Sequence, residues 1–177
     1  MAPKVSPRRE VAALCAPSRY PVGVIAIREA APRDAPALAA LRCDFRSGLA
    51  PSREEREAFV RRCSAWMSES LSQGWKCWLA ARQEEIVGQI WLQLVPKLPN
   101  PNGEPERHAY ITNLYVKPEC RGGVGSRLLR AALEFAQAQA VDAVILWPTP
   151  RSRSLYLRHG FTPPGDLLEL RRDRGPR

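Results

Sequence analysis

A glycine-rich stretch two-thirds of the way along the chain has the residue types and spacing best suited to hold an anion. It follows an apolar, β-favouring segment, precedes an amphipathic helical pattern, and reads Arg121-Gly122-Gly123-Val124-Gly125-Ser126. Glycines let backbone N–H groups approach an anion without interference from a Cβ atom. A helix N-terminus adds unpaired donors and partial positive charge, and Arg121 adds a full charge. The stretch therefore predicts a pyrophosphate-binding loop.

Two familiar phosphate loops do not fit this stretch. A nucleotide P-loop ends in Gly-Lys-Ser/Thr, whereas Gly125 is followed by Ser126 and Arg127. A dinucleotide fingerprint needs a third glycine where this chain has Leu128, and it belongs near the first strand of its fold. The sequence therefore disfavours both a nucleoside triphosphate and a dinucleotide as the ligand.

The hydrophobic pattern predicts the elements that position the loop. Strands are expected at 22–28, 76–82, 86–95, 109–116 and 141–146, with a last one at 166–170. Helices are expected between Pro32 and Gly48, between Ser52 and Gly74, and over 124–136 and 152–159. The strand, helix and strand around the glycine loop form a βαβ unit, so its two strands are expected to be parallel. The expected fold is one α+β, or mixed α/β, domain over residues 22–170.

Three local patterns add detail to this fold. Ser52-Arg53-Glu54-Glu55 is a capping-box pattern that begins the second helix, whose apolar stripe, Trp66 included, is expected in the core. Gln89 and Trp91 share a strand face that is expected to be half-exposed. The apolar positions of the strand before the loop step from Ile111 to Leu114, which predicts a β-bulge near Thr112-Asn113.

The composition narrows the classes of function. At 177 residues and 45% hydrophobic, the chain can build one well-cored domain, with a flexible leader over 1–21 and a basic tail over 171–177. Residues 1–20 and 171–177 supply six of the nine net positive charges, so a nucleic-acid surface is disfavoured. No apolar run approaches the ~20 residues that span a bilayer, and no signal peptide is recognisable. Five scattered cysteines without a C-x-x-C pair disfavour a metal site and favour a reducing, cytoplasmic compartment.

Two motifs, in this order and at this separation, resemble the GCN5-related N-acetyltransferase (GNAT) superfamily over residues 22–170. The run from Leu114 to Leu129 is similar to the family's acetyl-CoA loop. The run from Leu155 to Phe161, with Tyr156 four residues before Gly160-Phe161, is similar to its late helix. Ile27-Arg28-Glu29-Ala30 is similar to its opening strand. The resemblance implies a mostly antiparallel sheet with a parallel splay that takes acetyl-CoA.

The glycine loop departs from the family's Q/R-x-x-G-x-G/A pattern by one residue. Aligned from the helix side, Gly123 and Gly125 match and Cys120 takes the place of the arginine. Aligned from the strand side, Arg121 matches and one loop residue is missing. The position of the Arg121 charge is left open by these two alignments.

The resemblance implies a reaction and the parts of the chain that would support it. A primary amine attacks the acetyl-CoA thioester directly, backbone donors stabilise the oxyanion, and a proton donor assists the departing thiolate. The implied donor is Tyr156, because a phenol stays protonated at neutral pH. By the same resemblance, the strand end binds pantetheine through the backbone groups of Leu114, Tyr115 and Val116. The loop holds the pyrophosphate through its amides, beside the charge of Arg121, and these amides belong to Gly122, Gly123, Val124, Gly125 and Ser126.

The general base, the acceptor and the oligomeric state are not indicated by the sequence. His108, His159 and Asn113 are polar residues near the motifs, but none has a pattern that marks a base. Trp91, Tyr110 and Trp147 could line an acceptor site, although packing is the simpler interpretation of each. The acceptor is expected to be a small-molecule or protein amine, and a homodimer is compatible with the chain. A non-catalytic acyl-CoA-binding domain is the alternative hypothesis.

Overall fold

The computed structural model describes residues 24–46, 51–99, 101, 106–165 and 167–170. Its strands and helices follow the expected order along the chain. They are β1 (Ile25–Glu29), α1 (Ala35–Arg46), α2 (Arg53–Ser72), β2 (Trp75–Arg82), β3 (Glu85–Pro96), β4 (Arg107–Val116), α3 (Val124–Ala138), β5 (Ala143–Ile145) and α4 (Arg153–Arg158). Two short 3₁₀ turns, η1 (Pro32–Asp34) and η2 (Pro118–Cys120), precede α1 and α3. The predicted leader and tail, and Gly48, lie outside the described residues.

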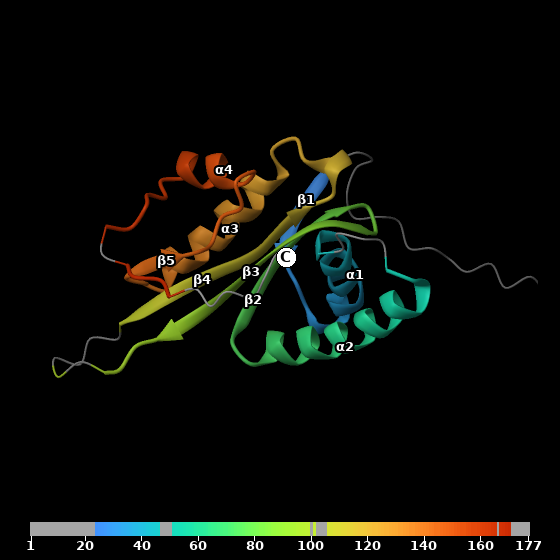
Figure 1. Ribbon diagram of the computed structural model, residues 1–177, viewed down its shortest axis with the longest axis horizontal. Helices are drawn as coiled ribbons and strands as arrows, with labels where there is room; N and C mark the ends of the chain where they lie inside the picture. The colour runs from blue at the N-terminus through green and yellow to red at the C-terminus, as the bar shows by residue number, and fades with distance from the viewer. Residues whose placement is uncertain (1–23, 47–50, 100, 102–105, 166, 171–177) are drawn as a thin grey trace, which may run out of the picture.

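A five-stranded sheet in the order β1-β2-β3-β4-β5 forms the centre of the domain. The first four strands pair antiparallel, and β4 pairs parallel with β5. Helices α1 and α2 cover one face of the sheet, while α3 and α4 lie on the other (Figure 1). The predicted mixed α/β class and the parallel βαβ unit are therefore confirmed.

The two faces of the sheet bury separate hydrophobic clusters. The cluster under α3 includes Ile90, Ile111 and Leu128, and the cluster under α1 and α2 includes Leu38 and Trp91. Strand side chains alternate between the two faces, so β2 and β3 contribute to both clusters. The sheet thus separates two regions of the domain that share a backbone but not a core.

The predicted β-bulge in β4 is confirmed. Trp91 lies opposite Thr112 and Gln89 lies opposite Tyr115, so β4 holds one more residue than β3 across this interval. Asn113 adopts a left-handed conformation with φ of 55°. The extra residue returns Leu114 to the α3 face that Ile111 also occupies, which is why the hydrophobic step of three still fills one core.

The expectation that Gln89 and Trp91 are half-exposed is wrong, because both are buried. The indole Nε1 of Trp91 donates to Gln89 Oε1 at 2.8 Å, and Gln89 Nε2 donates to the carbonyl of Leu38 in α1 at 3.0 Å. Each polar group thus has a partner, and these hydrogen bonds compensate for the hydration that the amide and the indole lose when they are buried under α1. Trp66, expected in the core, is 50% exposed instead, although its ring contacts both Trp75 and Trp91.

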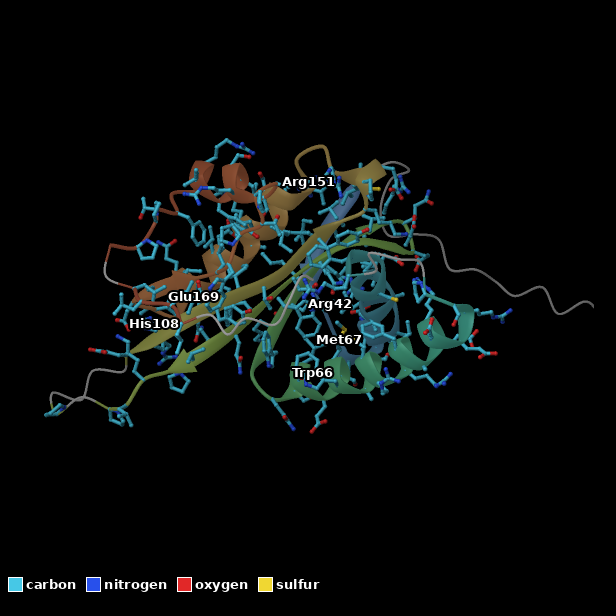
Figure 2. The ribbon with its side chains drawn as sticks, viewed as in Figure 1. Arg42, Trp66, Met67, His108, Arg151 and Glu169 are labelled. Atoms are coloured by element: carbon cyan, nitrogen blue, oxygen red, sulfur yellow. The ribbon has the colours of Figure 1, made fainter. Side chains whose placement is uncertain are left out.

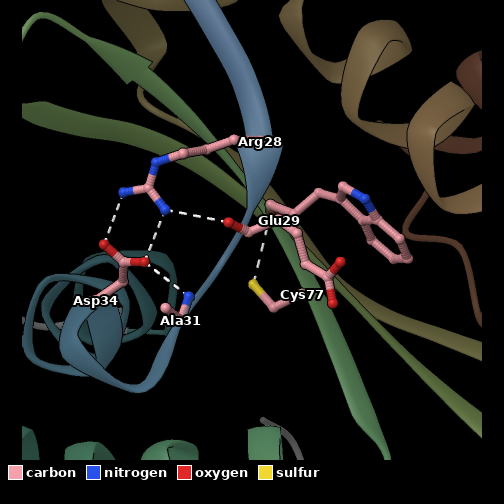
Figure 3. A network of polar contacts seen from close by, with 6 residues as sticks. Arg28, Glu29, Ala31, Asp34 and Cys77 are labelled. Atoms are coloured by element: carbon pink, nitrogen blue, oxygen red, sulfur yellow. Dashed lines mark hydrogen bonds and ion pairs between the residues drawn. The ribbon is translucent and has the colours of Figure 1, made fainter.

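An ion pair joins the start of α1 to the sheet. Arg28 on β1 donates to both carboxylate oxygens of Asp34 at 2.7 and 2.8 Å, and the backbone N–H of Ala31 donates to the same carboxylate at 2.8 Å (Figure 3). These hydrogen bonds, the one from Arg28 above all, hold the pKa of Asp34 below its ordinary value despite burial. The predicted capping box of α2 is confirmed by reciprocal bonds between Ser52 and Glu55.

The last predicted strand, over 166–170, is wrong for the described residues 167–170, which form no strand. Pro163 and Pro164 precede them, and proline lacks the N–H that a sheet ladder needs. Strand β5 is also shorter than predicted, with only three residues, and so offers a short edge for pairing. Leu168 and Leu170 are consequently more than 90% exposed.

Candidate active site

The two parallel strands diverge partway along their length. Pairing between β4 and β5 joins His108 to Ala143 and ends where Tyr110 meets Ile145. Strand β4 continues for six residues beyond Tyr110, and that part of its β5-side edge has no strand partner among the described residues. Leu114, Tyr115 and Val116, which were predicted to bind pantetheine through their backbone, all lie on this stretch.

The glycine loop begins directly after this free edge. Gly123 is the N-cap of α3 and has φ of 86°, a left-handed conformation that glycine adopts without strain. The N–H of Val124 donates to the carbonyl of Arg121 at 2.9 Å, and the first α-helical bond runs from Arg127 N–H to Gly123 at 3.2 Å. The buried side chain of Val124 fixes the start of the helix against the core.

Four amides of the loop are without an acceptor in the described part of the chain. The N–H groups of Gly122, Gly123, Gly125 and Ser126 have no acceptor among the residues that the structure describes. The first turn of α3 contains no acidic side chain. Clustered free donors at a helix N-terminus favour an anion such as a phosphate.

The side chains around the loop show where its positive charge lies. Cys120 is buried in the core beneath α3, so its thiol is not available to a ligand at the surface. Arg121 is half-buried, and its Nε donates to the carbonyl of Val116, the last residue of β4, at 3.4 Å. The Arg121 guanidinium therefore lies at the junction of the free strand edge and the loop.

Helix α4 lies against the glycine loop, so the two motifs identified in the sequence meet in space. A Cβ atom at Gly125 would come within 3.7 Å of the Cδ2 atom of Leu155. The neighbouring Tyr156 is 8% exposed, and its ring packs edge-on against Phe161 at 5.6 Å between centroids. Burial raises the pKa of Tyr156, while its hydrogen bond with Ser152 lowers it by less. The phenol therefore keeps its proton at neutral pH.

Tyr156 also lines a cavity of about 540 Å³ beside β5. Residues from β5, from α4 and from the segment after α4 form its walls, and His108 lies at its β4 end. The Nδ1 atom of His108 is buried and has no hydrogen-bond partner within the described parts of the chain. The sequence had singled out His108 without a role, and the structure places it in the same cavity as Tyr156.

The face of the sheet under α1 and α2 carries a second group of polar and aromatic side chains near the splay. Arg42 on α1 donates from Nη1 to Asn113 Oδ1 at the bulge, at 2.7 Å. Tyr110 packs edge-on against Trp147 at 5.4 Å, and Trp147 is 53% exposed. Figure 2 shows Arg42 and Trp66 on the side of the sheet that carries α1 and α2, well apart from His108. Sequence reasoning missed Arg42, because an arginine in an amphipathic helix carries no signal of its own.

Among the described residues, no three His, Cys, Asp or Glu side chains gather in a way that could hold a metal ion. The helices in these ranges include none that is both long and apolar enough to cross a membrane.

Comparison with known proteins identifies the family. The model of the acetyltransferase (GNAT) family matches residues 36–161, which is well over half of the chain. The chain therefore belongs to the GNAT acetyltransferase family. No protein of curated function matches it in sequence.

Solved structures share this fold at low sequence identity. A predicted acetyltransferase from Clostridium acetobutylicum, solved with acetyl-CoA, has a TM-score of 0.65 at 21% identity, over 84% of this chain and 96% of its own. A GCN5-related N-acetyltransferase from Ralstonia eutropha has a TM-score of 0.64 at 20% identity, over 83% and 98%. Glucosamine-6-phosphate N-acetyltransferase from Arabidopsis thaliana has a TM-score of 0.62 at 14% identity, over 84% and 98%.

Proposed function

We propose that this protein is an acetyl-CoA-dependent N-acetyltransferase that transfers the acetyl group to a primary amine by direct attack on the thioester. The observation that carries the proposal is the junction of an unpaired strand edge with a loop of free amides. Such a junction offers hydrogen bonds to an amide-bearing pantetheine arm and, directly after it, to a pyrophosphate. Family membership supports the same function.

The residues of the junction fit acetyl-CoA as a substrate. The backbone edge of Leu114, Tyr115 and Val116 would bind the pantetheine arm as an added strand. The amides of Gly122, Gly123, Gly125 and Ser126 would hold the pyrophosphate, with Val124 anchoring the helix behind them. Arg121 would add charge at the strand end, between the two groups. The C. acetobutylicum protein of similar fold was solved with acetyl-CoA.

Tyr156 is proposed to donate a proton to the departing CoA thiolate. Its helix lies beside the glycine loop, its hydroxyl is protonated at neutral pH, and it lines a cavity. A thiolate with a conjugate thiol pKa near 8.5 leaves more readily when a proton donor is positioned beside it. No side chain is assigned as general base.

The test combines binding with turnover. Isothermal titration calorimetry measures the affinity of the protein for acetyl-CoA and CoA. Release of free thiol in the presence of each of a panel of primary amines measures acetyl transfer. The proposal predicts that both ligands bind and that at least one amine accelerates thiol release over water. A protein that binds neither acetyl-CoA nor CoA would overturn the proposal as a whole.

A non-catalytic acyl-CoA-binding domain is the second candidate function. It is favoured by the glycine loop, which is one residue shorter than the family pattern, and by the turn of Arg121 toward Val116. This alternative predicts acetyl-CoA binding without acceleration by any amine. It also predicts that Tyr156→Phe changes nothing that is measured.

A further inference from the structure

Arg42 holds a guanidinium group at the bulge of β4, on the face of the sheet opposite the glycine loop. Its Nη1 donates to the Oδ1 atom of Asn113 at 2.7 Å. The left-handed conformation of Asn113, at φ 55°, belongs to the bulge itself. Because the bulge lies beyond the point where β4 and β5 separate, Arg42 is positioned beside the part of β4 that is proposed to bind the acyl arm.

Within the described ranges of the chain, the charge of Arg42 is not balanced by a carboxylate. Three other arginines of the domain show what such a pair looks like, because Arg28 pairs with Asp34, Arg53 with Glu57, and Arg56 with Asp44. No carboxylate of the described residues lies within salt-bridge distance of Arg42, although this side chain is half-buried. A guanidinium has five N–H donors, and the bond to Asn113 uses one of them.

The titratable groups that act on Arg42 include no carboxylate. They are Arg46 on the same helix, Cys63 on α2 and Tyr110 on β4. Burial lowers the pKa of Arg42, and repulsion by Arg46 adds to the effect. The guanidinium carbons of Arg42 and Arg46 both lie near the ring of Phe45, at 5.8 and 6.0 Å. Two positive charges therefore lie close together around Phe45, and the half-buried one at Arg42 has lost part of its hydration. An anionic ligand would compensate for that loss of hydration.

Aromatic rings continue from this charge toward solvent. Tyr110 packs against Trp75 at 6.4 Å and against Trp147 at 5.4 Å. Trp75 in turn contacts Trp66, so the series ends in two half-exposed indoles, Trp66 and Trp147. Half-exposed aromatic rings that are linked to an arginine through Tyr110 favour a ligand that is partly apolar and partly anionic.

We propose that Arg42 binds an anionic group of the acceptor, so that the preferred acceptor is an amine that also carries a carboxylate or phosphate. Tyr110 and Trp147 contact the apolar part of that acceptor, and Asn113 acts as a positioning residue that orients the guanidinium. This inference rests on the proposed acetyltransferase function and narrows its substrate class. A planar guanidinium whose other donors have no acceptor among the described residues suits either oxyanion, and bidentate contact with one of them is the strongest form of that interaction.

Matched acceptor pairs test the proposal. Phenylalanine is compared with phenylalaninamide, and glucosamine 6-phosphate with glucosamine, by measuring kcat/KM for thiol release. The proposal predicts that the protein prefers the anionic member of at least one pair by about tenfold or more. The pair that shows the preference identifies carboxylate or phosphate as the anion. A protein that uses both members of each pair equally well overturns the proposal.

Variants separate recognition from a purely structural role. In Arg42→Met the preference is expected to fall to within about twofold, because kcat/KM falls far more for the anionic member than for the neutral one. Arg61→Met removes an exposed arginine from α2 and is expected to leave the preference intact. If Arg42→Met does not fold, Arg42→Lys keeps the charge without the planar fork and is expected to retain only part of the preference. Equal loss for both members in either variant, or a full preference in Arg42→Lys, contradicts the proposal.

A binding measurement keeps this inference distinct from the proposed catalysis. If no amine is acetylated although acetyl-CoA binds, the catalytic proposal fails and Arg42 is still tested by calorimetry. N-acetylphenylalanine and its amide are titrated into the CoA complex of the protein and of Arg42→Met. Tighter binding of the acid by about tenfold, lost in the variant, supports the anion site. Equal binding of acid and amide overturns it.

Discussion

The two faces of the sheet carry two different kinds of candidate binding surface. On the α3 face the donors are backbone amides of Gly122, Gly123, Gly125 and Ser126, which any sequence with this backbone would present. On the α1 and α2 face the polar donor is the Arg42 side chain, held by an amide from another element. A main-chain surface can stay the same across a family, whereas a side-chain surface can differ in every member. The comparison suggests that the first face handles the common substrate and the second selects the acceptor.

Removal of the Tyr156 hydroxyl is expected to have the largest effect. Tyr156→Phe keeps the buried ring against Phe161 and removes the proposed proton donor, so kcat should fall about a hundredfold. The affinity for acetyl-CoA and the preference among acceptors should stay unchanged, which would place the hydroxyl in the chemical step and on neither binding surface.

The pH profile provides the control for this prediction. Because the pKa of Tyr156 is raised, its proton is lost only above the ordinary phenol range near 10. Turnover of the unmodified protein should fall as the pH rises through that higher value, and Tyr156→Phe should lack this limb. A variant with unchanged kcat would exclude the acid role.

The second prediction disturbs only the α1 and α2 face. Gln89→Met leaves the Trp91 indole and the Leu38 carbonyl without partners in a buried place, which should lower the free energy of unfolding by about 2 kcal/mol. Gln93→Met, on the same strand but only half-buried, is the matched control and should cost less. Chemical denaturation measures both.

If the two faces are independent, Gln89→Met should leave acetyl-CoA affinity unchanged below the melting temperature. A tenfold loss of that affinity would show that the faces are coupled through the sheet.

The third prediction disturbs only the α3 face. Gly123→Val places a β-branched residue at φ 86°, which costs about 1–2 kcal/mol and displaces the free amides. Acetyl-CoA affinity, measured by calorimetry, should fall about tenfold. Gly74→Val is matched, since Gly74 has φ of 96° and open space around it but lies after α2. Gly74→Val should destabilise the fold to a similar extent without changing the affinity for acetyl-CoA. Equal losses of that affinity in both variants would argue against pyrophosphate binding by the glycine loop.

The smallest effect is expected at the Arg28–Asp34 pair, which belongs to neither binding surface. Asp34→Asn should lower the free energy of unfolding by about 1 kcal/mol near neutral pH. The pKa of Asp34 is lowered in the folded protein, so the stabilisation is present above the unfolded pKa near 3.9 and is lost as the pH falls through the lower folded value. Denaturation curves of the two proteins should therefore converge in acid.

Asp44→Asn is the control for this pair, because its partner Arg56 and Asp44 itself are both exposed. An exposed ion pair contributes little, so this variant should change stability by less than about 1 kcal/mol at any pH. A cost as large as that of Asp34→Asn would mean that burial does not set the strength of these pairs.

Much of the fold could be predicted from the sequence because its signals are local. The capping box at Ser52, the glycine at Gly74 and the hydrophobic step from Ile111 to Leu114 each depend on residues a few positions apart. The last strand failed because a strand also needs a partner, and β5 with three residues after a short turn offers little edge to Leu167–Leu170. The prediction that Gln89 is half-exposed also failed because it depends on distant partners, which are the Leu38 carbonyl of α1 and the indole of Trp91.

The sequence by itself determined the glycine loop and its likeness to an acetyltransferase, since consecutive glycines after a strand define a backbone conformation locally. The order of the two motifs also follows from the chain alone. Only the tertiary structure decided that Leu155 lies beside Gly125, that Arg121 turns to Val116, and that Arg42 meets Asn113 across 71 positions of sequence. The physical reason is that backbone conformation depends on neighbours along the chain, whereas the partner of a charge depends on which elements pack together.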